Sequence, residues 1–436
     1  KHLIDFIPSK PSIEDISTKL FQLGHEHEIY EDIFDMDITP NRGDCLSIKG
    51  LLRDLAFFYE IDFTNELYEN DIKPLKINFI NRAQEKCPHI SFLKIDIEGE
   101  IKPYQGLFQN YFDDLGINKN NFFTDVSNYI SYETGQPTHC YDGEKINNEI
   151  SLEIMNVNYE FETLVGKKIE LIDENLVFRK GDGAVINLAG IMGGHNTSCT
   201  SNTKSVIVEC AYFDPEAIIG KSVRYDIKSE AAHKFERGSD PLCHEMVLRR
   251  FIKIVETHAN IKNIEIFKKD YLDYKPVKIK FDDKQLNKIL GTSINKEDLI
   301  NYLLKLGFSI LNDSIISPSY RSDIKTTNDI AEEIARMVGY DNINAIPLKI
   351  PKSSNNSKNS NILEETEKNF LTKHGFFEVV NTPFVNNDEV QSIKVDNPLD
   401  STRQYLRTRL QNSLVENLLY NEKRQHDSVK LFEISD

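Results

Sequence analysis

Apolar residues recur at helical spacing near the start of the chain, in two stretches. Residues 11–24 hold the first pattern, which stops at Gly24, a typical helix C-cap. Residues 43–59 hold the second pattern, and Asp44 can cap the helix that it predicts. The apolar residues of this second helix fall on one side: Leu51, Leu52, Leu55 and Phe58. We therefore expect a small helical unit over residues 1–72.

The pattern changes at about residue 73, where short apolar runs begin to alternate with turns. Several of these runs predict strands or strand pairs: residues 89–97, 167–172, 176–194 and 204–213. Glycine-rich turns between them favour a backbone that comes close to a neighbouring group. We expect one mixed α and β domain over residues 73–270.

A third unit is expected over residues 275–347. Its pattern predicts a strand, a helix that ends near Gly291, a second helix that ends at Gly307, and then a pair of strands. A last helix ends at Gly339, and its buried stripe is formed by apolar residues spaced four apart: Ile330, Ile334 and Val338.

A polar stretch, residues 347–365, is typical of a linker. Beyond it the pattern predicts alternating helices and strands: a helix over 364–376, a strand over 377–385, a helix near 410–423 and a strand over 429–435. We assign residues 355–436 to a further domain. At 436 residues the chain has room for about three domains of ordinary size, so we expect an α+β, multidomain fold.

The net charge narrows the possible functions. The chain has 52 Lys and Arg against 69 Asp and Glu, so its formal charge is −17. A protein that coats nucleic acid by charge alone needs clustered basic residues, so that class is disfavoured. Local contacts with nucleic acid, or a basic partner subunit, are compatible with this charge.

The cysteines and the apolar runs indicate a compartment. The 6 cysteines include no C-x-x-C pair, which disfavours a zinc ribbon or a disulfide framework and favours reduced thiols. No apolar run approaches the ~18 residues that a membrane span requires. The first residues carry no targeting pattern. We therefore expect a cytoplasmic protein that does not enter a membrane.

Four carboxylates stand close together in the stretch SDIKTTNDIAEEIARMVGYDN, residues 322–342. They are Asp323, Asp329, Glu332 and Glu333. One interpretation is local: Asp329 caps the helix, Glu332 completes a capping box, and acidic residues in a first turn suit the helix dipole. The other is a site for a hard cation, because residues three and four apart share a helix face and Mg²⁺ prefers oxygen ligands.

Two short segments place polar groups or glycines beside tight turns. In residues 125–142, Asn128 and His139 flank a Gly-Gln-Pro turn. Loops carry function more often than cores do, although a lone histidine is usually structural. In residues 186–198 the glycines do not have the spacing of a phosphate-binding loop, so we expect Gly193 and Gly194 to shape a pocket for a small ligand.

A carboxylate and a pair of small residues complete the candidate chemistry. Glu209 interrupts an apolar strand, so it either faces solvent or is partly buried and needs a hydrogen-bond donor, such as the amine of a bound ligand. Farther along, Ser229 and Ala231 are small enough to line the floor of a pocket.

Taken in order, these segments resemble one family, the bacterial-type phenylalanine–tRNA ligase (phenylalanyl-tRNA synthetase) beta subunits. The matching pieces lie between Asp37 and Ile434: DITPNRGDCLS, DVSNYISYETGQPTHCYD, LAGIMGG, VECAYFDP, KFERGSDP, PSYRSDIKTTNDIAEEIARMVGYDNI, VDNPLDSTRQYLRTRL and VKLFEI. Each piece is weak alone, but the ordered set is specific.

The resemblance implies an α₂β₂ enzyme that uses ATP to activate phenylalanine and then charges tRNA(Phe). Adenylation, and therefore ATP binding, would belong to the alpha subunit. For this chain the resemblance implies an editing domain over 73–270 that hydrolyses mischarged Tyr-tRNA(Phe). It also implies a small winged-helix-like domain over 275–347 and part of an inert class II synthetase-like antiparallel core over 355–436.

The family's functional residues carry over by motif. The implied editing pocket consists of Asn128, His139, Glu209, Ser229 and Ala231, with the Gly193–Gly194 turn nearby. Glu209 would read the tyrosine hydroxyl, and His139 with Asn128 would position the ester or the attacking water. Ala231 would keep the pocket open. The implied Mg²⁺ site, shared with the alpha subunit, consists of Asp323, Asp329, Glu332 and Glu333.

The chain departs from the family pattern in several places. Ser229 stands where Thr is usual, and Gly43 stands where Pro is usual. Compared with the family pattern, we expect this chain to lack the oligonucleotide-binding-fold insert and the C-terminal region. We therefore expect one tRNA-binding module to be absent and the Mg²⁺ site to be empty or weakly occupied without the alpha subunit.

Two other functions remain open at this point. One is a structural scaffold subunit without editing activity, in which the pocket persists as a relic. The other is a stand-alone nucleic-acid-binding module built on the winged-helix-like unit, against which the charge of −17 counts.

Overall fold

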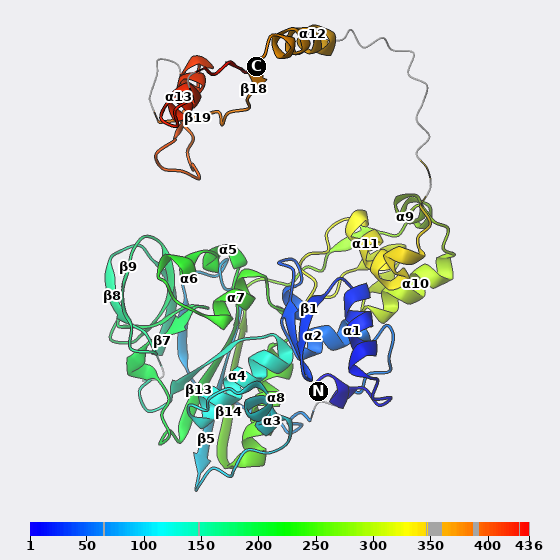
Figure 1. Cartoon of the computed structure of the whole chain (residues 1–436). Helices are drawn as coiled ribbons and strands as arrows, with labels where there is room; N and C mark the ends of the chain where they lie inside the picture. The colour runs from blue at the N-terminus through cyan, green and yellow to red at the C-terminus, as the bar shows by residue number, and fades with distance from the viewer. Residues whose placement is uncertain are drawn as a thin grey trace. The chain divides into compact units, whose positions relative to one another are not determined.

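The computed structural model describes residues 1–63, 66–146, 149–345, 347, 360–386, 392–426 and 428–435. It divides into two compact units, Lys1–Ile346 and Pro347–Asp436 (Figure 1). Mixed α and β structure with several separate sheets is observed, as expected. In the described part of the chain, no helix combines the length and the apolar composition needed to cross a bilayer.

The N-terminal region holds the two expected helices and a hairpin that the sequence pattern does not predict. Its elements are η1 (Ile4–Phe6), α1 (Ile13–Gln22), β1 (Glu26–Tyr30), β2 (Ile33–Asp37), η2 (Gly43–Cys45) and α2 (Ile48–Leu55). The prediction that Asp44 caps the second helix is wrong. Ser47 is the N-cap, because its hydroxyl accepts a hydrogen bond from the Gly50 amide at 3.0 Å.

Two five-stranded sheets form the next region. The first has the order β3-β14-β5-β13-β6. Its strands are β3 (Lys73–Pro74), β14 (Asn260–Asp270), β5 (His89–Glu98), β13 (Ser205–Tyr212) and β6 (Thr138–Asp142). The second has the order β12-β11-β10-β7-β4. Its strands are β12 (Met192–Gly193), β11 (Val185–Leu188), β10 (Asn175–Lys180), β7 (Glu149–Met155) and β4 (Asn78–Asn81).

A hairpin and short helical turns join or flank these sheets. The hairpin is formed by β8 (Tyr159–Glu162) and β9 (Lys168–Leu171). The short helices are η3 (His195–Thr197), α5 (Pro215–Ile218), α6 (Lys221–Arg224) and α7 (Glu230–Glu236).

The two faces of β13 look into different cores, because successive side chains of a strand point to opposite sides. Ile207 and Ala211 pack into a core that also holds Val177 and Ile186 of the second sheet. The alternate residues of β13 pack against the helices α3 (Gly106–Leu115), α4 (Phe122–Thr134) and α8 (His244–His258). Glu209 lies between Ile207 and Ala211 in the alternation, so it points into the core between the sheets.

The region after the sheets combines helices with a small antiparallel sheet of order β15-β17-β16. Its elements are β15 (Lys278–Lys280), α9 (Asp283–Leu290), α10 (Lys296–Lys305), β16 (Ser309–Leu311), β17 (Ser314–Ile316), α11 (Thr327–Val338) and η4 (Tyr340–Asn342). Its apolar residues form one core with those of the N-terminal helices, including Leu20, Leu52, Leu286, Leu303 and Ile334. These two regions, far apart in sequence, therefore fold onto each other.

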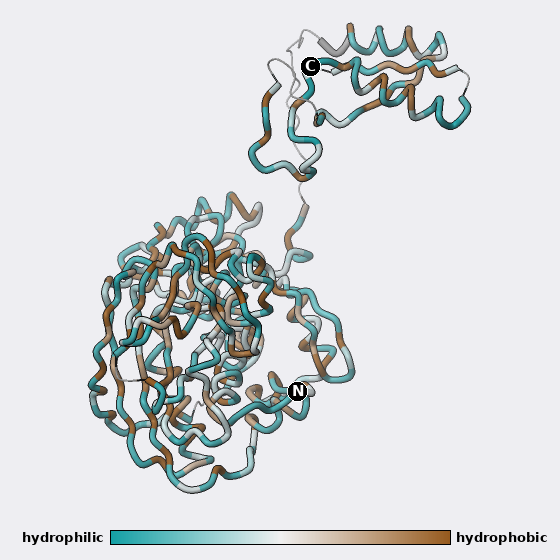
Figure 2. The backbone as a smooth tube through the Cα atoms, turned by 90° about the vertical axis from the view of Figure 1, so that its left-hand side faces the viewer, coloured by the Kyte–Doolittle hydropathy of each residue, from teal (hydrophilic) through white to brown (hydrophobic). Residues whose placement is uncertain are grey.

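The second unit holds short elements. They are α12 (Ser360–Lys373), β18 (Phe377–Glu378), β19 (Phe384–Val385), β20 (Tyr405–Leu406), α13 (Gln411–Glu422) and β21 (Leu431–Phe432). The prediction of one strand over 377–385 is wrong, because β18 pairs with β21 and β19 pairs with β20. Hydrophobic and hydrophilic positions alternate along its helices (Figure 2). Most of the predicted linker, residues 348–359, lies outside the described residues.

Candidate functional site

A buried carboxyl group is the centre of the candidate site. The Tyr141 hydroxyl on β6 donates a hydrogen bond of 2.6 Å to Glu209 Oε2. Asn187, on β11 of the facing sheet, donates from Nδ2 to the same oxygen at 3.2 Å and to the Tyr141 oxygen at 2.9 Å. Exposed fractions of 4% for Glu209, 0% for Tyr141 and 3% for Asn187 place this triangle inside the protein. The solvent-facing interpretation of Glu209 is therefore wrong.

Burial shifts the ionisation of this carboxyl group. It raises the pKa of Glu209 to about 7, while the hydrogen bonds from Tyr141 and Asn187 act in the opposite direction. Burial, together with the charge on Glu209, raises the pKa of Tyr141 well above its ordinary value. Near neutral pH, Tyr141 therefore remains a hydrogen-bond donor while Glu209 exchanges between its two protonation states.

His139 lies directly opposite Glu209 in the pairing of β6 with β13. Its ring stands edge-on to the Tyr141 ring, with centroids 4.5 Å apart. Its Nε2 atom is buried and has no hydrogen-bond partner among the described residues. Burial lowers the pKa of His139 to about 4, so the imidazole is neutral at pH 7. A buried polar atom without a partner suits a bound water or ligand.

Glycine at position 193 lets the turn approach this imidazole. A Cβ atom at Gly193 would lie 2.2 Å from His139 Cε1 and 2.6 Å from Nε2, which a side chain cannot do. At Gly194 a Cβ would lie 2.9 Å from the Ile186 carbonyl oxygen. The glycine pair therefore packs the turn against His139 and β11, as the expected close backbone approach requires.

Ser229 and Ala231 connect the same turn to α7. The Ser229 hydroxyl donates to the Ile191 carbonyl oxygen at 2.6 Å and accepts from the Ala232 amide at 3.0 Å. Ser229 is thus the N-cap of α7 and also fixes the strand that leads to Gly193. Ala231 is partly buried and packs at the border of the core between the sheets.

Asn128 lies apart from this cluster by its contacts. It is exposed on α4, and no hydrogen bond or ion pair joins its side chain to another residue in the described ranges. Its neighbour Ser127 donates to the Thr138 carbonyl oxygen at 2.7 Å, which fixes α4 against the start of β6. The structure therefore brings His139, Glu209 and the Gly193 turn together but leaves Asn128 outside their hydrogen bonds.

The sequence interpretation misses two residues of the cluster, Tyr141 and Asn187. Tyr141 is two positions after His139 in a strand, so alternation alone places both on one face. Asn187 is a polar residue in a strand whose residues are otherwise apolar. The sequence contains both of these signals. It does not reveal which sheet faces Glu209.

The acidic motif divides into two parts in the structure. Thr326 is the N-cap of α11, and Asp329 completes its capping box by accepting hydrogen bonds from the Thr326 amide at 2.6 Å and the Lys325 amide at 2.8 Å. The predictions that Asp329 is the cap and that Glu332 completes the box are wrong by three residues. Glu332 is exposed.

The other two carboxylates of the motif are bound by arginine. Arg321 donates to both oxygens of Asp323 at 2.8 Å, and to the two oxygens of Glu333 at 2.6 and 2.8 Å. Arg336 donates to Glu333 at 2.6 and 3.2 Å. Burial alone would raise the pKa of Glu333, but the guanidinium groups of Arg336 and Arg321 lower it to about 2. Glu333 therefore stays ionised at neutral pH.

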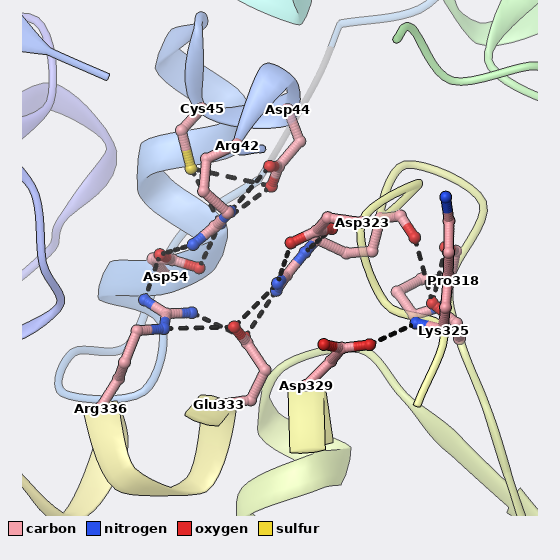
Figure 3. A network of polar contacts seen from close by, with 12 residues as sticks. Arg42, Asp44, Cys45, Asp54, Pro318, Asp323, Lys325, Asp329, Glu333 and Arg336 are labelled. Atoms are coloured by element: carbon pink, nitrogen blue, oxygen red, sulfur yellow. Dashed lines mark hydrogen bonds and ion pairs between the residues drawn. The ribbon is translucent and has the colours of Figure 1, made fainter. Parts of the chain in front are cut away.

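The network continues into the N-terminal region (Figure 3). Arg336 donates to Asp54 of α2 at 2.9 Å, and Arg42 donates to the same oxygen at 2.9 Å. Arg42 also binds both oxygens of Asp44, at 2.9 and 3.0 Å. Figure 3 shows Glu333 and Arg336 reaching from α11 toward Asp54 on α2. We call this set the arginine network: Arg42, Asp44, Asp54, Arg321, Asp323, Glu333 and Arg336.

One group of metal-ligating side chains lies beside the arginine network. Among the described residues, ligand atoms of His25, Cys45 and Asp54 lie within 4.8 Å of one another, and all three are buried. However, Arg42 donates to Asp54 and lies 2.8 Å from the Cys45 sulfur. A guanidinium among these atoms already neutralises Asp54 and repels a cation, so the group is part of the network.

Three segments of this chain match the sequence models of known domain families. Residues 87–260 match the B3/4 domain, residues 279–340 match the tRNA synthetase B5 domain, and residues 343–436 match the phenylalanyl tRNA synthetase beta chain CLM domain. The candidate cluster falls in the first match and the acidic motif in the second. The three matches follow one another in the order expected from the resemblance.

Two of the similar curated proteins share a name. The phenylalanine–tRNA ligase beta subunit of Legionella pneumophila (strain Lens) is 28% identical over 93% of this chain and 53% of that protein. The corresponding subunit of Cutibacterium acnes is 29% identical over 92% of this chain and 50% of that protein. The chain thus spans about half the length of the curated relatives that it matches.

A solved structure offers only a distant likeness. An N-terminal fragment of the phenylalanyl-tRNA synthetase beta-subunit from Pyrococcus horikoshii aligns with 75% of this chain and 94% of that chain. The sequence identity is 14% and the TM-score is 0.41.

Proposed function

We propose that this chain, a relative of the phenylalanine–tRNA ligase beta subunits over most of its length, has two tasks in an α₂β₂ complex. It supports the ATP-dependent charging of tRNA(Phe) by an alpha subunit, and it hydrolyses mischarged Tyr-tRNA(Phe). The alpha subunit and tRNA(Phe) are its partners, and the cytoplasm is where we expect it to work. ATP binds to the alpha subunit in this proposal.

The single observation that carries the editing proposal is the state of Glu209. Both hydrogen bonds that the Glu209 carboxyl group receives in the described chain go to Oε2, and its other oxygen, Oε1, receives none. A phenol can donate to an ionised carboxyl oxygen or accept from a protonated one, whereas a phenyl ring can do neither. A side-chain pocket that ends at Oε1 would therefore favour tyrosine over phenylalanine.

An enzyme that activates phenylalanine needs a second pocket, one that recognises tyrosine, for a physical reason. A binding site built for phenylalanine cannot strongly reject tyrosine, since an apolar pocket discriminates weakly against an added hydroxyl. A separate site that hydrogen-bonds the phenol can remove the resulting errors. Glu209 supplies that recognition here.

Other residues of the cluster hold the ester and water. His139 is neutral and its Nε2 has no protein partner, so it can hold the attacking water or an ester oxygen. Ser229 fixes the turn at Gly193, Gly194 packs that turn against β11, and the small side chain of Ala231 leaves room beside it. Asn128 is exposed on α4, where it can meet the nucleotide end of the substrate. We assign no general base.

Magnesium binding by the acidic motif stays a prediction, and the fit of its residues is partial. Asp323 and Glu333 already give both oxygens to guanidinium groups, so they do not fit a metal ion as they stand. Asp329 gives one oxygen, Oδ2, to the cap of α11, and Glu332 is exposed. The carboxylates that fit are Asp329 and Glu332, with further ligands from the alpha subunit and water.

The finer domain assignments are also proposals. We infer an N-terminal helical unit over 1–72, an editing domain over 73–270 and a winged-helix-like domain over 275–347. The helices α9, α10 and α11 around a three-stranded sheet support the third of these. We assign 355–436 to part of a class II synthetase-like core.

Hydrolysis of Tyr-tRNA(Phe) by the complex with the alpha subunit tests the editing proposal. We expect the wild type to deacylate Tyr-tRNA(Phe) faster than Phe-tRNA(Phe), and Glu209→Ala with His139→Ala to abolish the difference. Glu98→Ala, at the exposed end of β5, is the matched control and should keep it. If wild type and double variant are equally inactive, the chain is a scaffold without editing.

A further inference from the structure

Glu209 is held in place by two residues to which the proposed function gives no part. Tyr141 and Asn187 come from different sheets, and both donate to the same carboxyl oxygen, Oε2. Asn187 also donates to the Tyr141 oxygen at 2.9 Å, so the three polar groups form a closed triangle. Such a triangle fixes the rotation of the carboxyl group about its last bond.

We propose that Tyr141 and Asn187 are positioning residues that turn Glu209 so that its Oε1 atom alone reads a hydroxyl on a bound aminoacyl group. This inference rests on the proposed editing function and deepens it. The substrate class that it selects is the ester of an aromatic amino acid that carries a ring hydroxyl.

Proton placement follows from the two donors. The Tyr141 O–H and the Asn187 N–H both point at Oε2, so this oxygen is an acceptor in either state of Glu209. When Glu209 is neutral, its proton sits on Oε1 and can be donated to a phenol oxygen. When Glu209 is ionised, Oε1 accepts the phenol proton. A ring hydroxyl can thus be read on both sides of the carboxyl pKa.

The surroundings contribute no competing charge near neutral pH. The titratable groups that act on Glu209 are Tyr141 and three thiols: Cys87, Cys140 and Cys210. Burial raises the pKa of each of them, so all are neutral at pH 7. His139, opposite Glu209, is neutral because burial lowers its pKa. A titration observed near pH 7 at this site therefore belongs to Glu209.

The variant Tyr141→Phe removes one oxygen atom and keeps the ring that packs against His139. The matched control is Tyr104→Phe, because Tyr104 makes the same kind of bond, 2.9 Å long, to the buried Asp125 in the other core. Both variants lose a hydrogen bond from a tyrosine to a buried carboxyl group. Of these two tyrosines, only Tyr141 donates to Glu209. The two variants therefore separate the positioning of Glu209 from the general stability of the protein.

The experiment measures binding and hydrolysis separately, in the complex with the alpha subunit. Binding uses uncleavable 3′-amide analogues of tyrosyl- and phenylalanyl-adenosine, and hydrolysis uses the two aminoacyl-tRNAs from pH 5.5 to 8.5. We expect Tyr141→Phe and Asn187→Leu to lower the preference for tyrosine by about tenfold, the worth of one hydrogen bond to a charged group. We also expect the pH midpoint of the Glu209 carboxyl titration, followed by its infrared band in the complex without substrate, to rise in both variants, because each removes a bond that lowers the pKa of Glu209.

Each outcome separates the two proposals. If the wild type prefers the tyrosyl analogue but hydrolyses neither ester, the hydrolysis proposal fails and the positioning inference stands, provided that Tyr141→Phe loses the preference. If Tyr141→Phe keeps the preference and the pH midpoint of the wild type, the positioning inference is overturned. A wild type with no preference in binding also overturns it. A loss of preference in Tyr104→Phe of equal size would assign the effect to stability alone.

Discussion

At the scale of single residues, the candidate site brings together two side chains whose ionisation is shifted in opposite directions. Burial raises the pKa of Glu209 to about 7 and lowers that of His139 to about 4. Both shifts favour the neutral form. Between these two values the site can be buried without charge, which explains how a glutamate and a histidine coexist between two sheets.

The shift at Glu209 predicts a pH-dependent cost to stability. The folded chain holds the Glu209 proton up to about pH 7, whereas the unfolded chain releases it near the ordinary value of 4.5. The free energy of unfolding therefore falls as the pH rises from 4.5 to 7. Glu209→Gln removes this cost, so its stability relative to wild type should increase by about 3 kcal/mol between pH 4.5 and pH 8. Urea unfolding at a series of pH values measures the difference.

The control for this measurement is Glu98→Gln, since Glu98 is exposed at the end of β5. Its stability curve should run parallel to that of the wild type across the same range. A parallel curve for Glu209→Gln as well would mean that burial does not raise the pKa of this carboxyl group.

The sequence predicts part of this site at the residue scale. Glu209 is recognisable because it interrupts an apolar strand, and Gly193 because it follows a strand and precedes another glycine. Asn187 is not predictable as a partner, because its contact with Glu209 depends on how two sheets face each other. The pairing of His139 with Glu209 likewise depends on the register of β6 and β13.

At the scale of elements, α11 combines a capped first turn with charged side chains that reach the arginine network. Its first turn is closed by Thr326 and Asp329, and its next turns present Glu333 and Arg336 to the arginine network. Adjacent glutamates at 332 and 333 fall on different sides of the helix surface, so one is exposed and the other buried. This pair allows a direct comparison of a buried carboxylate that binds arginine, Glu333, with an exposed one, Glu332.

Neutralising each glutamate of this pair should have very different effects. Glu333→Gln leaves Arg321 and Arg336 buried with fewer acceptors, so we expect a loss of about 3–5 kcal/mol in the free energy of unfolding. Glu332→Gln should change it by less than about 0.5 kcal/mol. Chemical denaturation with and without magnesium measures both. A magnesium-dependent gain in the wild type that Glu333→Gln lacks would instead make Glu333 a metal ligand.

Most helices could be predicted from the sequence, but the hairpin could not. Helices α9 and α10 end near Gly291 and Gly307 as expected, because apolar spacing and a glycine are local signals. The hairpin of β1 and β2 is absent from the prediction because its acidic residues hide the alternation. The cap of α11 is displaced by three residues because Thr, Asn and Asp stand in succession and each suits a cap.

At the scale of the whole molecule, the arginine network couples two regions of the first unit. Asp54 and Arg336 are 282 positions apart in sequence, but Arg336 Nη1 lies 2.9 Å from Asp54 Oδ2. The two helices that carry these residues also contribute to one shared apolar core. No local pattern predicts it, because each partner taken alone is an ordinary charged residue on an amphipathic helix.

This coupling predicts an effect at a distance. Asp54→Asn removes a charge that faces Arg42 and Arg336, so amide hydrogens of α11 should exchange faster than in the wild type. The amides of α12 and α13, in the second unit, should keep their rates. Hydrogen–deuterium exchange followed by mass spectrometry measures both, with Asp273→Asn at an exposed position as the control. Changes confined to α2 would contradict the coupling.

The distance of Asp54 from Arg336 along the chain also sets a delay during synthesis. A ribosome adds about 5–20 residues per second, so the 282 positions between them take roughly 14 to 56 seconds to be made. Until then, α2 packs without α11, and Asp54 lacks Arg336. The part of the core that α2 shares with α11 is therefore completed late in synthesis, and a chaperone that binds apolar segments of the growing polypeptide should release α2 only after residue 336 emerges.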